Sequence, residues 1–326
     1  MIKIKWSGYL AAALCLSATG LQGRESVFRE LPFFPIVGYN MLWQADEKMI
    51  EEQADMGLTL VTVATMDELS WCQKYDIKGI LCNPAYHRFL RDPESPELQQ
   101  TLRKDLAEFG QCPALYGIQI ADEPGKNDMP GFEKMLAAVN ELKPGLLSYC
   151  CLFPDYSTSA QHGFGNYEAY INAYIDLFKK YGSAPVCYDN YANKDVKIPG
   201  SEQQAAFLRN LETIRRLTLD QKVPFWVTVL SASHDYFPDP GEADINFAVF
   251  ASLAYGAKGI GYFTTNSHPA FAFQGGPFDV LKEKTPLWRA IRDCNYRVRM
   301  LGGYLNQLRS TGVFYKIGRA SCRERV

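Results

Sequence analysis

Two carboxylates, Asp122 and Glu123, directly follow the apolar run Tyr116–Ala121, and Pro124 comes after them. Burying an unpaired charge costs free energy. Carboxylates at the end of a buried strand therefore either cap the next element or take part in chemistry. The chemistry that such groups perform best is general acid and base catalysis.

Side chains alternate between the two faces of a strand. Ile118 and Ile120 share a face with Asp122, whereas Gln119 shares the opposite face with Glu123. If the isoleucines contact covering helices, Glu123 points inward. Loss of hydration there would raise the pKa of Glu123 and allow this residue to act as an acid.

Polar and aromatic residues also follow the other apolar runs. Together they form a ring of hydroxyl-matching donors and acceptors beside aromatic rings, which suits a neutral sugar. The ring consists of Asn40 and Trp43, Thr65, Asn83 and His87, Ser231, and Asn266, while Tyr188 and Tyr191 beside Asp189 are expected to stack on the sugar.

The elements that must position these residues alternate eight times between strand-like and helix-like patterns. The strands are short continuous apolar runs, which is typical of a parallel sheet buried on both faces. The predicted pairs are 35–40 with 47–56, 58–64 with 67–75, 78–83 with 96–109, 116–121 with 130–142, 146–152 with 167–181, 185–189 with 201–218, 224–230 with 242–255, and 258–263 with 286–308.

Eight such units without a linker predict an α/β protein with a closed (β/α)8 TIM barrel, in which active sites lie at the carboxyl ends of the strands. An open, doubly wound sheet would require a glycine-rich fingerprint after the first strand, and Gly38–Leu42 does not provide one. Asp67 is the expected N-cap of the second helix.

The two ends of the chain differ from this pattern. Residues 1–23 combine early lysines, a short apolar core and small residues, which indicates a signal peptide and hence a secreted or periplasmic protein. The barrel is expected over residues 24–308. Residues 309–316 resemble the start of a truncated C-terminal region, and residues 317–326 resemble a translated sequencing adapter.

Composition argues against several other classes of function. A net charge of −2 gives no electrostatic case for nucleic acid. The apolar core of the leader is too short to span a membrane, and no other apolar run is long enough. The four histidines form no HxH pair, so no metal or other cofactor is expected. Lys78 and Lys258 stand at strand starts, away from the face that a Schiff-base lysine would occupy.

The cysteines give no sign of a disulfide framework. Seven of the nine remain once the two in the leader and the tail are set aside, and an odd number cannot pair completely. Four of them fall in predicted strands and are expected to be buried apolar side chains: Cys82, Cys150, Cys151 and Cys187.

The segment Ala254–Thr264 resembles the corresponding part of family 42-type β-galactosidases, and a Glu at the end of strand four is the acid/base of clan A glycoside hydrolases. The resemblance covers residues 34–308 and implies that Glu123 is the acid/base. The chain departs from that pattern in two places. Asp122 stands where the family has Asn, and no Glu follows strand seven, where the next carboxylate is Asp235.

Asp189 is the preferred second carboxylate because it stands directly at a strand end, ahead of Asp155 and Asp235. It would act as nucleophile or as base, depending on its distance from Glu123. The residues expected to orient the sugar are Asp122, Asn83, Tyr188, Trp43, Asn40, His87 and Tyr191. A carbohydrate-binding barrel without catalysis and a purely structural barrel remain alternatives, and the oligomeric state stays open.

Overall fold

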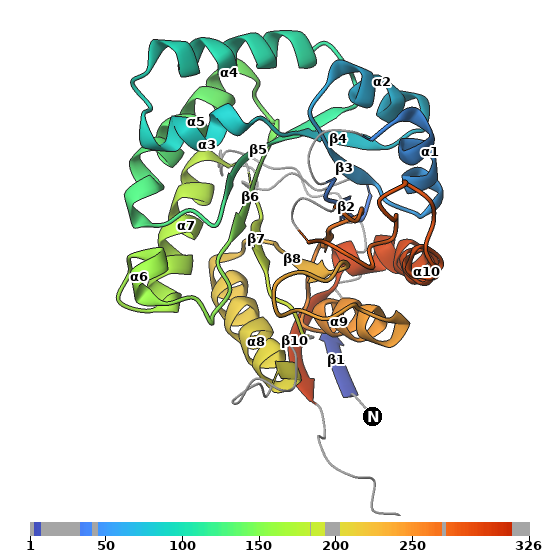
Figure 1. The fold of residues 1–326 in the computed structure, drawn as a ribbon. Coiled ribbons are helices and arrows are strands. Elements are labelled where there is room, and N and C mark those ends of the chain that lie inside the picture. The colour runs from blue at the N-terminus through green and yellow to red at the C-terminus, as the bar shows by residue number, and fades with distance from the viewer. Residues whose placement is uncertain are drawn as a thin grey trace, which may run out of the picture.

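The predicted (β/α)8 barrel is confirmed. The computed structural model describes residues 3–7, 33–40, 45–182, 184–192, 203–268 and 272–314. Eight parallel strands pair in chain order and close between the first and the last (Figure 1). They are β2 (Ile36–Gly38), β3 (Leu60–Val63), β4 (Lys78–Leu81), β5 (Leu115–Asp122), β6 (Leu147–Leu152), β7 (Val186–Asp189), β8 (Phe225–Leu230) and β9 (Ile260–Phe263).

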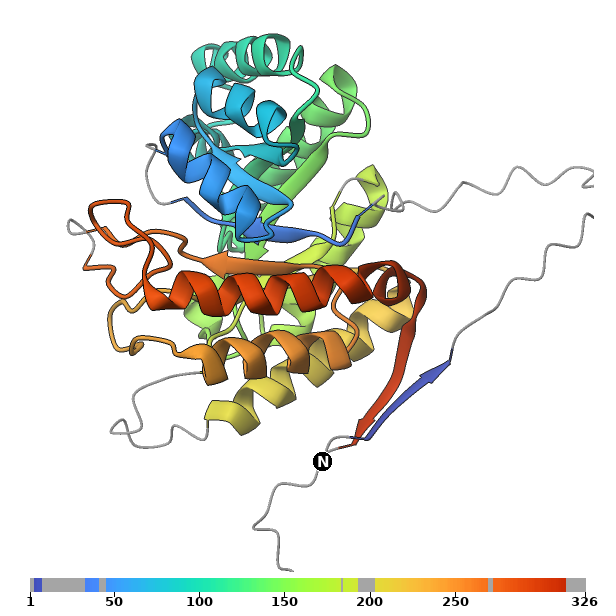
Figure 2. The same ribbon diagram turned by 90° about the vertical axis from the view of Figure 1, so that its right-hand side faces the viewer.

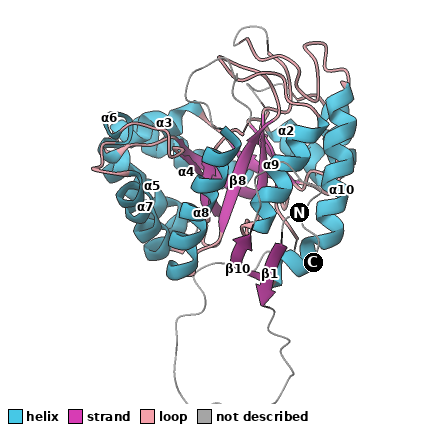
Figure 3. Cartoon of the chain, turned by 90° about the horizontal axis from the view of Figure 1, so that it is seen from below, coloured by secondary structure: helices cyan, strands magenta, loops and turns pink. Residues whose placement is uncertain are grey.

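Helices surround the strands on the outside of the barrel (Figures 1 and 3). Within the described residues, no helix has the length and apolar character needed to cross a membrane. The helices are α1 (Glu47–Asp55), α2 (Met66–Lys74), α3 (Pro84–Arg91), α4 (Pro96–Phe109), α5 (Met129–Leu142), α6 (Ser159–His162), α7 (Tyr167–Tyr181), α8 (Gln203–Gln221), α9 (Glu242–Ala254) and α10 (Pro286–Gln307), with a short 3-10 helix at Lys126–Asp128.

Short polar side chains set where several helices begin. The Thr65 hydroxyl accepts from the Glu68 amide and starts α2, so the expected cap at Asp67 is wrong by two residues. Asn83 accepts from the Ala85 amide and starts α3, a helix that the sequence did not predict. This helix carries His87 and adds a wall to the mouth of the barrel.

The apolar residues of the strands form two separate cores. One fills the barrel interior and includes Val37, Leu60, Tyr149, Cys151 and Trp226. The other lies between the strands and the helices. Strand residues alternate between these two cores. Only the residues on the inward face of a strand can therefore reach the open end of the barrel. The four predicted strand cysteines are free thiols, three of them buried and Cys82 half-buried.

A second, two-stranded sheet lies apart from the barrel strands (Figure 2). It pairs β1 (Lys3–Ser7) antiparallel with β10 (Arg309–Phe314). The predicted leader thus includes β1, while the rest of it, residues 1–2 and 8–23, lies outside the described residues. The predicted adapter-derived tail also lies outside them.

Candidate active site

An irregularity in β5 decides how the two predicted carboxylates point. Gln119 pairs with Tyr149 and Ala121 pairs with Cys150, so the pairing register shifts at Ile120. The extra residue is a bulge that reverses the alternation beyond it. Asp122 consequently stands opposite Cys151, which belongs to the interior core. The expectation that Asp122 shares the outward face with the isoleucines is wrong.

Glu123 leaves the strand immediately after this bulge. Its φ angle is +46°, in the left-handed region, while its amide still donates to the Cys151 carbonyl at 2.8 Å. Its side chain and that of Asp122 are both exposed to solvent at the open end of the barrel. The chain therefore presents two neighbouring carboxylates at the mouth.

Asp189 reaches the same mouth from β7. It lies two residues beyond the interior residue Cys187, is 8% exposed, and pairs in register with Thr228. The Cys151 thiol lies 3.9 Å from Asp189 Oδ1. Asp189 therefore stands at the end of β7, as predicted, and on the inward face, which the sequence analysis did not address.

The three carboxyl groups influence one another. The surrounding wall reduces their hydration, although Asp122 and Glu123 keep one side open to solvent. This loss of hydration raises the pKa of Asp122 to about 6, with an opposing effect from His87. It raises the pKa of Glu123 to about 7, with a further contribution from the charge of Asp122.

Asp189 is the most deeply buried of the three groups. Burial raises its pKa well above the usual range, and the charges of Glu123 and Asp122 add to the effect. A hydrogen bond from Tyr191 opposes the rise. Because the charge of Glu123 acts on Asp189, the two groups lie within range of mutual electrostatic interaction.

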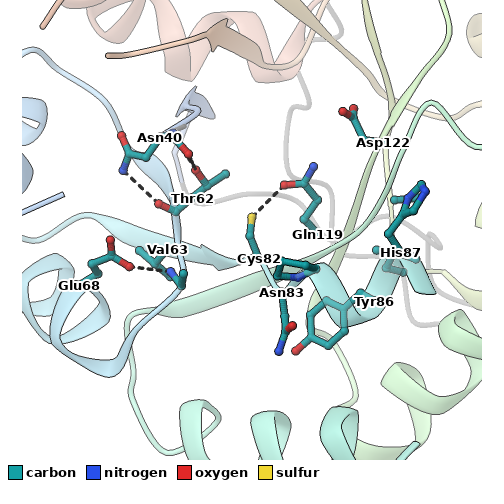
Figure 4. Close-up of a pocket in the computed structure, with 14 residues that line it drawn as sticks. Asn40, Thr62, Val63, Glu68, Cys82, Asn83, Tyr86, His87, Gln119 and Asp122 are labelled. Carbon is teal, nitrogen blue, oxygen red and sulfur yellow. Dashed lines mark hydrogen bonds between the residues drawn. The ribbon is translucent and has the colours of Figure 1, made fainter. Parts of the chain in front are cut away.

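A pocket of about 380 Å³ opens beside Asp122 (Figure 4). Residues from β3, β4, β5 and α3 line it, together with Asn40 from the end of β2. His87 and Asp122 lie close together along its rim, and Gln119 lies between Asp122 and Cys82. Its lining includes amide, imidazole and carboxylate groups that can bond to hydroxyl groups.

Two of the predicted sugar-orienting residues also serve the fold. Asn40 donates to the Thr62 carbonyl at 3.1 Å and accepts from Thr265 at 2.6 Å, which ties the ends of three strands together. Asn83 caps α3 and donates to Asp105 at 2.8 Å. Both line the pocket, yet these bonds already occupy their amide groups.

The remaining predicted residues have different outcomes. Tyr188 is fully buried in the core between strands and helices, so its expected contact with a sugar is wrong. Tyr191 faces the mouth, where its ring stacks on Phe263 with centroids 6.3 Å apart. Trp43 lies outside the described residues.

The end of β8 differs from the clan A pattern as the sequence indicates. The Ser231 hydroxyl donates to the Thr264 carbonyl at 2.8 Å and is buried. Asp235 lies farther along in a turn with φ of +50°. Asp155 accepts from the Asn190 amide at 3.3 Å. Neither alternative matches Asp189 in standing directly at an inward strand end.

Some groups at the mouth were not predicted. Tyr156 is 39% exposed, and the charges of Asp189 and Glu123 both act on it, together with that of Asp155. An aromatic cluster covers the β7–β9 side of the mouth and consists of Tyr191, His234, Phe237, Phe263 and Phe273. The abundance of aromatic residues was visible in the sequence, but their gathering from distant loops was not.

No cluster of three or more His, Cys, Asp or Glu side chains suited to a metal ion occurs within the described ranges.

Similarity to known proteins is structural. No protein-family model matches the sequence, and no curated protein matches it. A family 42 β-galactosidase from G. stearothermophilus aligns with a TM-score of 0.66 at 10% identity, over 87% of this chain and 59% of that chain. An endo-β-1,4-mannanase from Thermotoga petrophila aligns with a TM-score of 0.58 at 11% identity, over 83% and 77%.

A β-glucuronidase from Ruminococcus gnavus aligns with a TM-score of 0.54 at 11% identity, over 81% of this chain and 49% of that chain. This chain thus spans about half to three fifths of the length of two of these enzymes. At such low identity the likeness establishes a shared fold. The chain is a TIM barrel built like the barrels of these three enzymes.

Proposed function

We propose that this protein is a glycoside hydrolase acting on a neutral sugar or oligosaccharide, with Glu123 and Asp189 as its catalytic pair. The observation that carries the proposal is the meeting of these two carboxyl groups at one barrel mouth, from β5 and β7. The three similar structures, all of carbohydrate-cleaving enzymes by name, support it.

In the proposed reaction Glu123 gives its proton to the glycosidic oxygen as the bond from that oxygen to the anomeric carbon breaks. Asp189 takes a proton from a water molecule that attacks the anomeric carbon. The strands β5 and β7 are two strand spacings apart, about 10 Å. Water activation, and with it inversion at the anomeric carbon, requires about 6.5–9.5 Å between the two carboxyl groups, whereas direct attack with retention requires about 5 Å.

The acid role is assigned to Glu123 because this residue stands at the open end, where a leaving group can depart. Its pKa of about 7 also leaves about half of its carboxyl groups protonated at neutral pH. Burial of Asp189 supports the reverse assignment, since the more buried carboxyl group holds a proton more tightly. A comparison of substrates with different leaving groups separates the two assignments.

The main alternative is a carbohydrate-binding barrel without catalysis. The lack of a carboxylate over Phe225–Ser231, where clan A enzymes have their nucleophile, favours this alternative. It predicts that sugars bind equally well to the wild-type protein and to Glu123→Gln, with no turnover by either.

The test is a turnover screen of the full chain on aryl glycosides and oligosaccharides. Glu123→Gln is assayed alongside, with Glu108→Gln on the exposed face of α4 as the matched control. Turnover by the wild type and the control but not by Glu123→Gln supports the enzyme. The anomer released first, followed by proton NMR, then tests inversion.

We also propose that the protein is exported, on the basis of the leader-like residues 1–23. Expression of the full chain and N-terminal sequencing of the product tests this proposal. A product that retains Met1 inside the cell contradicts it.

A further inference from the structure

Gln119 is held in one orientation at the edge of the pocket. It lies on β5 just before the bulge, on the inward face, and Cys82 follows the neighbouring strand β4. The Cys82 thiol donates to Gln119 Oε1 at a distance of 2.8 Å between sulfur and oxygen (Figure 4). The carbonyl side of the amide is therefore occupied.

This contact turns the amide nitrogen of Gln119 toward the open pocket. In Figure 4 the nitrogen lies on the side of Asp122, and no described residue accepts a hydrogen bond from it. A primary amide nitrogen carries two donor hydrogens. Gln119 thus presents donors beside the carboxylate of Asp122, which presents only acceptors when ionised.

A donor next to an acceptor matches two adjacent hydroxyl groups, because each hydroxyl can both donate and accept. The amides of Asn40 and Asn83 on the same pocket wall are already used within the protein. Among the described amides of this wall, Gln119 is therefore the one whose nitrogen keeps both hydrogens for a ligand.

We propose that Gln119 is a specificity-determining residue that donates to a sugar hydroxyl next to the one bound by Asp122, and that Cys82 is the positioning residue that fixes its amide. This inference rests on the proposed function insofar as the ligand is a sugar. It requires only that the sugar binds, whether or not it is cleaved.

The thiol suits this role because it remains a donor. Burial and the charge of Asp122 both raise the pKa of Cys82. Cys82 therefore stays protonated at neutral pH. A thiolate at this position could only accept a hydrogen bond, and it would turn the amide nitrogen of Gln119 away from the pocket and toward the sulfur.

The experiment measures binding of D-galactose, D-glucose and D-mannose, and of their singly deoxygenated forms, by ligand-observed NMR titration. The full-chain wild type is compared with Gln119→Ala, Gln119→Glu, Cys82→Ala and Cys82→Ser. Gln119→Ala is expected to weaken the best-binding sugar about 3- to 10-fold, the effect of one neutral hydrogen bond. Gln119→Glu replaces the donor with a second carboxylate beside Asp122 and is expected to weaken it further.

Removing one particular hydroxyl from the sugar should weaken its binding to the wild type as much as Gln119→Ala weakens binding of the parent sugar. Gln119→Ala should then bind the parent sugar and this deoxygenated form equally well. Cys82→Ala frees the amide to rotate and should weaken binding about 2- to 5-fold. Cys82→Ser keeps a donor to Oε1 and should restore most of that loss, which a purely packing role would not predict.

Other outcomes decide against part or all of the inference, or against the proposed function alone. Unchanged binding by Gln119→Ala, or no binding of any of these sugars to the wild type, overturns it. Equal binding by Cys82→Ala and wild type, or equal weakening by Cys82→Ser and Cys82→Ala, overturns the role of Cys82. Sugar binding that depends on Gln119 without any hydrolysis would leave this inference standing while the proposed hydrolase fails.

Discussion

Replacing Glu123 with Gln removes the acidic proton and the charge of the carboxyl group while nearly keeping its shape, so its effect reports on acid catalysis. A general acid contributes roughly 10²- to 10⁴-fold. We expect Glu123→Gln to lose at least about 100-fold in kcat/KM on alkyl glycosides, whose leaving groups require protonation. On dinitrophenyl glycosides, whose leaving groups depart unprotonated, the loss should be no more than about tenfold, because departure requires no acid.

The pH dependence of the hydrolysis rate gives a second quantitative expectation. With a pKa of about 7 for Glu123, wild-type activity on alkyl glycosides should fall about tenfold for each pH unit well above 7. Glu123→Gln should lack this fall. The control Glu108→Gln, exposed on α4, should follow the wild type throughout.

The assay is initial-rate kinetics on a series of glycosides with leaving groups of graded acidity, from pH 4 to 9. Equal losses by Glu123→Gln on all leaving groups, with a graded loss by Asp189→Asn instead, would reverse the two roles. Full activity of Glu123→Gln on alkyl glycosides would refute the reasoning altogether.

Three further predictions concern stability. The pKa of buried Asp189 is raised, so the stability of the wild type should decline as the pH rises through that pKa. In differential scanning fluorimetry, Asp189→Asn should therefore melt at a higher temperature than the wild type at pH 9 and at a similar temperature at pH 4. An equal change in melting temperature at both pH values contradicts this prediction. Asn83→Ala loses the cap of α3 and should lower the urea-derived free energy of unfolding by about 1–2 kcal/mol, and an unchanged value would show that the cap contributes little. Gly131→Ala would bring a methyl group to 2.0 Å from the Leu90 carbonyl oxygen and should cost about 1–3 kcal/mol, whereas Gly303→Ala, with open space around it, should be neutral or stabilising in the same urea titration.

The barrel could be predicted because its two repeating signals are local. Continuous apolar runs and amphipathic stretches alternate regardless of how the strands close. Helix α3 was missed because its strongest signals, the cap Asn83 and Pro84 at its first turn, also suit a loop. The meeting of Glu123 and Asp189 was anticipated because both stand at strand ends, and a closed parallel barrel gathers those ends on one face.

The orientation of individual side chains was harder to predict. The bulge at Ile120 leaves no trace in the sequence, because an isoleucine suits either face of a covered strand. Tyr188 could have been excluded, since an inward Asp189 requires its neighbour to point outward. Gln119 and Cys82 come together across two strands, and their contact depends on a register that the sequence does not encode locally.

The backbone of Glu123 has a consequence for the evolution and engineering of this protein. A left-handed φ costs a non-glycine residue about 1–2 kcal/mol, a cost that glycine does not bear. A library selected for thermostability alone should therefore drift toward glycine at this position and lose the proposed acid as it gains stability. The same trade-off makes Glu123→Gly a rational starting point for a more stable, inactive barrel to which a new binding site could be added.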